Sequence, residues 1–328
     1  MRFSDGIQAQ PDALRRSAKS LEDALRQLPG VPSDQVIALV GIGASEHVAR
    51  SAAPVWRDAG LRAFAVSAAE LQHESRLVAD VHVGLSESGR SAETVAALRR
   101  LSGGRRVGVT NVAESPLAEL VDDVLCLDSG PDSPVYTTGY TATLQAMGML
   151  GEHWSGTRTD WSALPELAAT VLAGAADVVE EVRDVFDQAR LVDVVASGPS
   201  SATSGEGALM LRESARLHTA AHETYNYLHG PMEPLDPSTA CVVVGDGREV
   251  RLAQDTSALG CPTLLITGRD DVGSSGSLRV LTLPRTASPL ARAVLEILPL
   301  QLLGWSVASH RGLAVDGFRY HQDDTKLD

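Results

Sequence analysis

The sequence predicts an α/β protein made of two similar halves, each built on a parallel sheet covered by helices. Short runs of β-branched and other apolar residues end in Gly, Ser or Thr, and a helical pattern follows each run. Apolar runs without alternation indicate strands buried on both faces, and strands separated by helices indicate a parallel sheet with crossover connections. The same succession of segments occurs twice, which indicates a duplicated domain.

We expect four strands in each half from these runs. Those of the first half are 36–40, 79–85, 106–110 and 123–127. Those of the second half are 192–196, 241–244, 263–267 and 279–283.

The duplication rests on three pairs of segments at nearly one offset. VIALVGIGAS is matched about 155 residues later by LVDVVASGPS. GVTNVAES is matched by LITGRDDVGS, and VLCLDSG by VLTLPRT. The organisation we expect is a helical arm (1–30), a first domain (31–157), a linker helix (158–190), a second domain (191–311) and a polar tail (312–328).

Composition excludes several classes of partner. Lys and Arg number 28 and Asp and Glu 42, so the net charge of the 328 residues is −14. General nucleic-acid binding and attachment to an anionic membrane need the opposite balance. There are three cysteines and no CxxC pair, as in a reducing compartment. No leader-like segment or membrane span is visible, so we expect a cytoplasmic protein.

The first motif is Gly41-Ile42-Gly43-Ala44-Ser45-Glu46, between an expected strand and an expected helix. A dinucleotide-binding fingerprint would have a third glycine where Glu46 stands, and this carboxylate would repel a pyrophosphate. A tight turn that exposes backbone N–H groups and the Ser45 hydroxyl is the better interpretation, and a purely structural turn is the alternative.

The second motif is SESGRSAET, residues 86–94, again between a strand and a helix. A helix cap needs one hydroxyl, and several hydroxyls around a glycine at a helix N-terminus favour the binding of an anion such as phosphate. Simple capping is the alternative. The spacing of a nucleotide P-loop is absent from the sequence.

The third motif is a stretch with a helical pattern from Glu206 to Pro231. Glu206 and Glu213 fall on one side of this expected helix. The alternative without a functional role is that this side is an ordinary solvent-exposed face. His218 and His222 have the i, i+4 spacing of a metal pair, but we expect no metal because no third ligand is evident. His229 opens the turn HGP that ends the stretch.

Together these stretches resemble the tandem SIS (sugar isomerase) domain family, and within it the isomerase half of glucosamine-6-phosphate synthases. The resemblance extends over nearly the whole chain in unbroken order. It is carried by GIGAS (41–45), SESGRSAET (86–94), TNVAESPLAELVD (110–122), SGPDSPVYTT (129–138), EGALMLRE (206–213) and HGPMEPLD (229–236). It implies two domains, each a five-stranded parallel sheet flanked by helices (flavodoxin-like), and a homodimer with the site at its interface.

The resemblance also implies roles for individual residues. A sugar 6-phosphate would be held at its phosphate by Ser86, Ser88 and Ser91, with Glu87 in the same loop. The sugar would be lined by Gly43, Ala44, Ser45, Val135 and Thr137. The implied catalytic residues are Glu213, His229 and Lys326, with His229 supplied by the partner subunit and Lys326 on a tail that covers the sugar.

The chemistry of these residue types agrees with the implied roles. A base that removes a proton from C2 beside a carbonyl needs a pKa near neutrality, which a Glu in a closed site provides. Ring opening moves a proton between two oxygens, and a His titrates in the right range. Polar donors stabilise the enediol, so we expect neither a metal nor a cofactor.

Several positions depart from the synthase pattern. Glu87 stands where Gln is usual, and Ala44 replaces a hydroxyl residue. Met210 and Gly139 each stand where the synthase has a lysine, and the loss at 210 should raise the pKa of Glu213. The chain begins Met1-Arg2-Phe3, without the glutaminase domain and its N-terminal cysteine, so we expect it not to take ammonia from glutamine.

We therefore expect a cofactor-independent isomerase or deaminase of an amino-sugar 6-phosphate, such as glucosamine 6-phosphate converted to fructose 6-phosphate and ammonia. The alternatives are a lyase that dehydrates an N-acetylhexosamine 6-phosphate, a deglycase that cleaves a sugar–amine 6-phosphate, and a non-catalytic phosphosugar sensor. The sequence leaves the sugar, the outcome and the direction of the reaction open.

Overall fold

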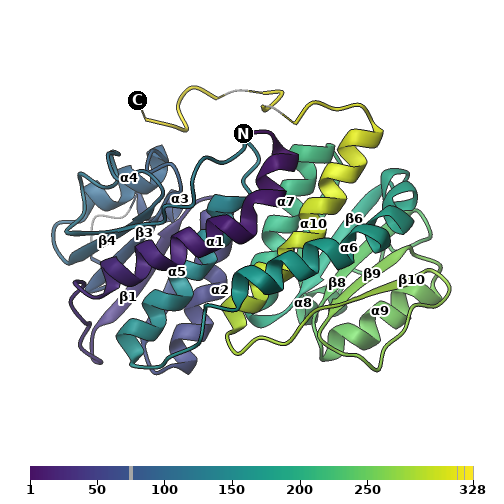
Figure 1. The fold of residues 1–328 in the computed structure, drawn as a ribbon, viewed down its shortest axis with the longest axis horizontal. Helices are drawn as coiled ribbons and strands as arrows, with labels where there is room; N and C mark the ends of the chain where they lie inside the picture. The colour runs from purple at the N-terminus through teal and green to yellow at the C-terminus, as the bar shows by residue number, and fades with distance from the viewer. Residues whose placement is uncertain (74–76, 316, 321, 328) are drawn as a thin grey trace.

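Two five-stranded parallel sheets form the framework of the computed structural model, which describes residues 1–73, 77–315, 317–320 and 322–327 (Figure 1). The first sheet contains β1 (Val36–Gly41), β2 (Arg62–Ser67), β3 (Val81–Leu85), β4 (Arg105–Thr110) and β5 (Asp123–Cys126). The second contains β6 (Leu191–Ala196), β7 (Thr219–Glu223), β8 (Thr239–Val244), β9 (Thr263–Thr267) and β10 (Leu278–Thr282).

The strand order is the same in both sheets. The first runs β2-β1-β3-β4-β5, and the second, read from its other edge, runs β7-β6-β8-β9-β10. Each is the 2-1-3-4-5 order of flavodoxin-like folds. Every pairing is parallel, so the predicted fold class of two helix-flanked parallel sheets is confirmed.

The two strands that the sequence did not reveal, β2 and β7, are edge strands. The central strand β8 is buried at all six positions, whereas β2 and β7 mix buried and exposed residues. The other two edge strands, β5 and β10, are also only partly buried, but the sequence did reveal them, so edge position alone does not explain why β2 and β7 were missed.

The prediction of one helix from Glu206 to Pro231 is confirmed only as far as Ala215 and is wrong beyond it. α7 (Ser201–Ala215) ends at Arg216, whose φ of 56° lies in the left-handed region. β7 and the short α8 (Thr224–Leu228) follow. His222 lies in β7 and His218 just before it, so the i, i+4 helical spacing does not apply to them.

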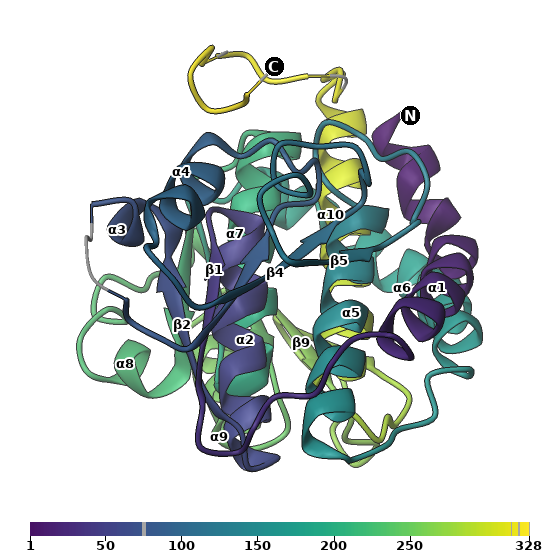
Figure 2. The ribbon, with the colours of Figure 1, turned by 90° about the vertical axis from the view of Figure 1, so that its left-hand side faces the viewer.

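The remaining helices cover the sheets and fill the space between the two halves (Figures 1 and 2). They are α1 (Phe3–Leu25), α2 (Ala44–Asp58), α3 (Ala68–Leu71), α4 (Ala92–Arg100), α5 (Thr138–Ser155), α6 (Leu164–Asp187), α9 (Arg248–Ala258) and α10 (Pro289–His310), with a 3-10 turn at Gly198–Ser200.

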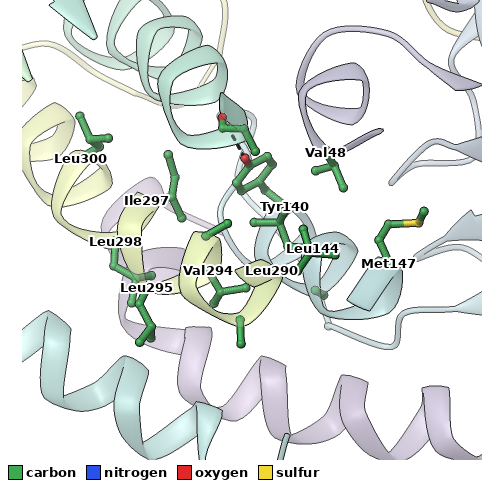
Figure 3. Packing of buried hydrophobic residues seen from close by; sticks show 14 of the residues in the cluster. Val48, Tyr140, Leu144, Met147, Leu290, Val294, Leu295, Ile297, Leu298 and Leu300 are labelled. Carbon is green, nitrogen blue, oxygen red and sulfur yellow. Dashed lines mark hydrogen bonds between the residues drawn. The ribbon is translucent and has the colours of Figure 1, made fainter. Parts of the chain in front are cut away.

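The halves meet through α5 and α10, whose apolar faces pack together. Figure 3 shows Tyr140 and Leu144 of α5 turned toward Val294 and Ile297 of α10. The Tyr140 hydroxyl donates a hydrogen bond to the Ala202 carbonyl at 3.2 Å, which ties α5 to α7. One hydrophobic core thus extends across both halves and fixes them relative to each other.

α10 is the one described helix that is long and apolar enough to span a membrane. In its most apolar window, 83% of the residues are buried inside the molecule. Burial between the halves therefore accounts for its composition.

Candidate functional site

A pocket of about 360 Å³ lies at the carboxyl ends of β1 and β3. In the order β2-β1-β3-β4-β5 the strand order reverses between β1 and β3. This point is the topological switch point, where open α/β sheets bind ligands. The first half contributes the turn after β1 and the loop after β3. The second half contributes α7, and Phe318, Thr325 and Lys326 of the C-terminal tail also line the pocket. Figure 2 shows the tail passing above the carboxyl ends of the first sheet.

The serine loop, residues 86–91, connects β3 to α4 and holds its hydroxyls in place by internal hydrogen bonds. The Ser86 hydroxyl donates to Ser91 Oγ at 3.0 Å and accepts from the Ser91 N–H at 3.3 Å. The Arg90 N–H donates to Ser88 Oγ at 3.3 Å. Gly89 has a φ of 65°, and any side chain there would overlap Ser115. The loop is therefore a compact turn at the N-terminus of α4, with several hydroxyl and backbone N–H donors close together.

The tail pairs with this loop in antiparallel fashion. The Ala92 N–H donates to the Thr325 carbonyl at 3.2 Å, and the Leu327 N–H donates to the Arg90 carbonyl at 2.8 Å. These bonds place the Lys326 ammonium beside the serine loop, although residues 316, 321 and 328 of the tail lie outside the described part.

Among the described residues that line the pocket, Lys326 is the one with a positively charged side chain. Its ammonium donates to Ser88 Oγ at 3.1 Å and to the Tyr136 hydroxyl at 3.3 Å, and it lies 5.8 Å from the centre of the Tyr136 ring. Burial lowers the pKa of Lys326, while the nearby Glu87 and Glu93 counteract this. An ammonium held at Ser88, beside a loop with two further serines, is a suitable site for a phosphate group.

Glu213 projects into the same pocket from the last turns of α7. Burial raises the pKa of its carboxyl group to about 7. A carboxylate with this pKa is substantially ionised at neutral pH and still a competent proton acceptor, as general-base catalysis requires. The expected elevation of its pKa therefore agrees with the structure, and its physical cause is desolvation.

The turn after β1 forms another wall. Gly43, Ala44 and Ser45 all line the pocket, and Gly43 caps α2 with a φ of 57°. A Cβ at Gly41 would lie 2.7 Å from the backbone of Ser45, so the chain can turn this sharply only with glycine there.

Two of the predicted sugar-lining residues lie behind the wall. Val135 and Thr137 are fully buried, and the pocket is lined instead by their neighbours Pro134 and Tyr136. Thr137 donates from its hydroxyl to Asp132 at 2.6 Å, which shapes the loop. The alternation of the loop explains the difference, since adjacent side chains point in opposite directions.

His229 is exposed at the end of α8, in the second half, and does not line the pocket. Its expected contribution through a partner subunit stays a prediction. The structure thus brings Glu213, Lys326, the Gly43–Ser45 turn, and Glu87 and Ser91 of the serine loop together in the pocket wall. Ser88 contacts Lys326 without lining the pocket, and Ser86 is buried behind it. His229, Val135 and Thr137 lie outside the wall.

Two departures from the synthase pattern, Glu87 and Gly139, depend on each other. Glu87 Oε1 accepts a hydrogen bond from Asn111 Nδ2 at 3.1 Å, and burial and Asp132 raise its pKa. A Cβ at position 139 would overlap the Cγ of Glu87. The glycine therefore makes room for Glu87, and a larger residue at 139 would require Glu87 to move.

Sequence reasoning missed Glu206, Tyr136, Glu93 and Phe318, which also line the pocket. Glu206 carried a signal, because it falls on the same side of α7 as Glu213. Glu93 and Tyr136 lie inside the motifs at 86–94 and 129–138 but were given no role, and Phe318 comes from the tail, where no periodicity marks it. Among the described residues, no group of His, Cys, Asp and Glu side chains is arranged to hold a metal.

Comparison with known families agrees with this architecture. Residues 33–152, which include the entire first sheet, match the family model described as SIS domain. An SIS domain is therefore found at residues 33–152.

Curated relatives extend the similarity into the second half. The chain is 29% identical over 253 residues to the glutamine–fructose-6-phosphate aminotransferase (isomerizing) of Zymomonas mobilis, and 30% identical over 256 residues to that of Caulobacter vibrioides. The matches cover 71% of this chain but only 42% of each relative. The chain is homologous to the isomerase domain of these aminotransferases and spans less than half of their length.

Solved structures share the complete fold. The C-terminal domain of glucosamine-fructose-6-phosphate aminotransferase from Francisella tularensis superposes with a TM-score of 0.82 at 21% identity, covering 96% of this chain and 97% of the other. A glucosamine-6-phosphate deaminase from Thermotoga maritima gives 0.79 at 23% identity, with 98% of each chain covered. The tagatose-6-phosphate ketose/aldose isomerase of Escherichia coli gives 0.79 at 17%, covering 98% and 96%. Both sheets and their helices are thus shared with these proteins.

Proposed function

We propose that this protein is a cofactor-independent isomerase and deaminase of an amino-sugar 6-phosphate, which removes the proton at C2 with Glu213. The observation that carries the proposal is a carboxyl group with a pKa of about 7 in the same pocket as the serine loop and Lys326. A base poised near neutrality and a phosphate-binding loop are the two parts that such an enzyme needs.

The phosphate would be held by Ser86, Ser88 and Ser91 and by the Lys326 ammonium. This fixes one end of the substrate and directs the sugar carbons toward α7. Because the chain as a whole is strongly acidic, we expect binding to depend on these short-range donors more than on long-range attraction.

The reaction begins with the open-chain aldehyde. Glu213 takes the proton from C2, the electron pair of the C2–H bond forms a C1–C2 double bond, and the aldehyde oxygen takes up a proton released by the ammonium group at C2, giving an enaminol. Return of the proton to C1 produces an imine at C2. Water then adds at C2 and ammonia leaves, which yields fructose 6-phosphate. Glu213 ends in its starting protonation state, and no redox partner is required.

His229 would act in ring opening from a second copy of the chain. It is exposed and outside the pocket of its own subunit, as this role requires. A homodimer in the cytoplasm, completing each site with the partner's histidine, is part of the proposal. The deaminase and isomerase named among the similar structures support it at the level of the fold.

The test is a substrate screen with a matched variant. Purified protein is incubated with glucosamine 6-phosphate, and ammonia and fructose 6-phosphate are measured together. The Glu213→Gln variant should lose at least a hundredfold in rate, and wild type in D₂O should incorporate deuterium at C1 or C2. An N-acetylglucosamine 6-phosphate arm, read for a new ultraviolet-absorbing enone, tests the dehydratase alternative. Absence of both ketose and ammonia would refute the proposal.

A further inference from the structure

Glu206 is a buried carboxyl group in the wall of the pocket that the proposed chemistry does not use. Its residue is only 2% exposed, and it lies two helical turns before Glu213 on α7. Within the part of the chain that the structure describes, its Oε2 atom is buried and has no hydrogen-bond partner. Buried polar atoms are nearly always paired, because leaving one without a partner costs free energy. The Oε2 atom of Glu206 is therefore available to accept a hydrogen bond from a bound ligand.

Among the described residues, the charged groups that act on Glu206 are both acidic. The carboxyl groups that act on it are Glu213 on the same helix and Asp132 from the loop before α5, and both, together with burial, raise its pKa. Tyr140 faces it from α5, but the Tyr140 hydroxyl donates to Ala202 O. One turn further along α7 stands Met210, which is buried and apolar.

The cation of the pocket lies elsewhere. Lys326 is held at the serine loop by Ser88 and Tyr136, and the carboxyl groups on which it acts are Glu87 and Glu93. The end of the pocket lined by Glu206 thus has acidic groups without a matching positive charge among the described residues.

We propose that Glu206 is the specificity-determining residue that receives a protonated amino group of the substrate. This inference rests on the proposed function, and it selects sugar 6-phosphates that carry an amine over those with a hydroxyl or an acetamido group. An ammonium group has three donors and no acceptor, so it pairs with an unpartnered carboxylate oxygen, whereas a hydroxyl forms only a weaker, less charged hydrogen bond there.

Pairing with an ammonium also changes the protonation of Glu206. The empty pocket favours the neutral carboxyl group, and a positive charge within about 4 Å favours the carboxylate. We therefore expect Glu206 to release a proton when the amine binds, which gives a calorimetric signature that a merely structural residue would lack.

The test uses two ligands that cannot react, because their C1 is reduced to an alcohol. They are 2-amino-2-deoxyglucitol 6-phosphate and glucitol 6-phosphate, which differ only in the amine. Binding is measured by titration calorimetry for wild type and for Glu206→Gln, in two buffers of different ionisation enthalpy. Glu249→Gln is the control: this carboxyl group is 4% exposed and outside the pocket, and it accepts hydrogen bonds from Ser197 and Gly247.

We expect wild type to prefer the amine by roughly tenfold or more, about 1.4 kcal/mol, with a proton released on binding. Glu206→Gln should remove most of this preference and the proton release, and change the affinity for glucitol 6-phosphate by less than about threefold. Glu249→Gln should keep the preference.

Other outcomes overturn the inference. Equal affinity of wild type for the two ligands, or a preference that survives in Glu206→Gln, refutes the role of Glu206 and leaves the proposed function standing. Equal weakening of both ligands indicates a structural role and also refutes it. Binding of neither ligand refutes the proposed function itself, and the inference with it. Replacing a buried acid by its neutral isostere should not lower the melting temperature, which is checked first.

Discussion

Replacing Glu213 by Gln should stabilise the protein while it abolishes activity. Burial raises the pKa of this carboxyl from the ordinary 4.5 to about 7. A difference of about 2.5 pKa units corresponds to about 3 kcal/mol, the cost of ionising the group in the folded rather than the unfolded protein. The neutral Gln avoids this cost.

The sign of the effect depends on pH. Below pH 4.5 the carboxyl is protonated in both states, so ionisation costs nothing. The cost grows as pH rises from 4.5 to about 7 and is constant above that, because the folded-state pKa is the higher one. At pH 5 it is under about 1 kcal/mol, and at pH 8 it reaches about 3 kcal/mol.

The assay is thermal unfolding of wild type and Glu213→Gln at pH 5 and pH 8. With an unfolding entropy of about 2.1 cal/mol/K per residue, 3 kcal/mol raises the melting temperature of a chain of this size by about 4 °C. Glu22→Gln, an exposed change on α1, controls for the substitution itself. If Glu213→Gln is no more stable than wild type at pH 8, the assignment of a costly buried base is refuted.

Four further outcomes are expected. The kcat/KM of wild type should fall about tenfold per pH unit below about 7, as Glu213 becomes protonated, and a flat profile would exclude it as the base. Lys326→Met should raise the KM for a sugar 6-phosphate by roughly tenfold or more through loss of the ammonium at Ser88, with a circular dichroism spectrum like that of wild type; an unchanged KM would contradict the phosphate role. Gly139→Ala should lower stability by about 1–3 kcal/mol through overlap with Glu87, and Glu87→Ala in the same chain should recover most of it, as measured by denaturant unfolding. Mixing the inactive variants Glu213→Gln and His229→Ala should restore up to about a quarter of wild-type activity if subunits exchange and share sites, whereas no recovery in an exchanged dimer would exclude a shared site.

The central strands of both sheets were predictable because burial on two faces requires uninterrupted apolar runs. β2 and β7 were not found, although the edge strands β5 and β10 were, so partial burial at an edge weakens the signal without always removing it. The break between α7 and β7 was missed for a different reason. It depends on the left-handed conformation of Arg216. Helix ends of this kind usually have Gly or Asn at that position, so an arginine gives no sequence signal.

At the site, motifs after strands predicted the serine loop and the turn at Gly43–Ser45, because the carboxyl ends of parallel strands gather at one edge. The position of Lys326 came from the resemblance alone, since no local pattern ties a tail to a loop more than two hundred residues away. Val135 and Thr137 were predicted to line the pocket, but their neighbours Pro134 and Tyr136 do so instead. Side-chain direction in an irregular loop depends on contacts such as that of Thr137 with Asp132, which sequence does not reveal.

The two halves divide the work of the pocket unequally. In the second half, the loop after β8 is the counterpart of the serine loop, and it has no hydroxyl between Gly245 and Glu249; its Asp246 is held by Arg292 instead. In the proposed function the first half would thus hold the phosphate, and the second supplies the carboxyl groups of α7. The distance between the serine loop and the Glu213 carboxyl group therefore depends on how the two halves pack, including the contact of α5 with α10. A substitution at that seam, such as Ile297→Val, is expected to change turnover without touching a single residue of the pocket.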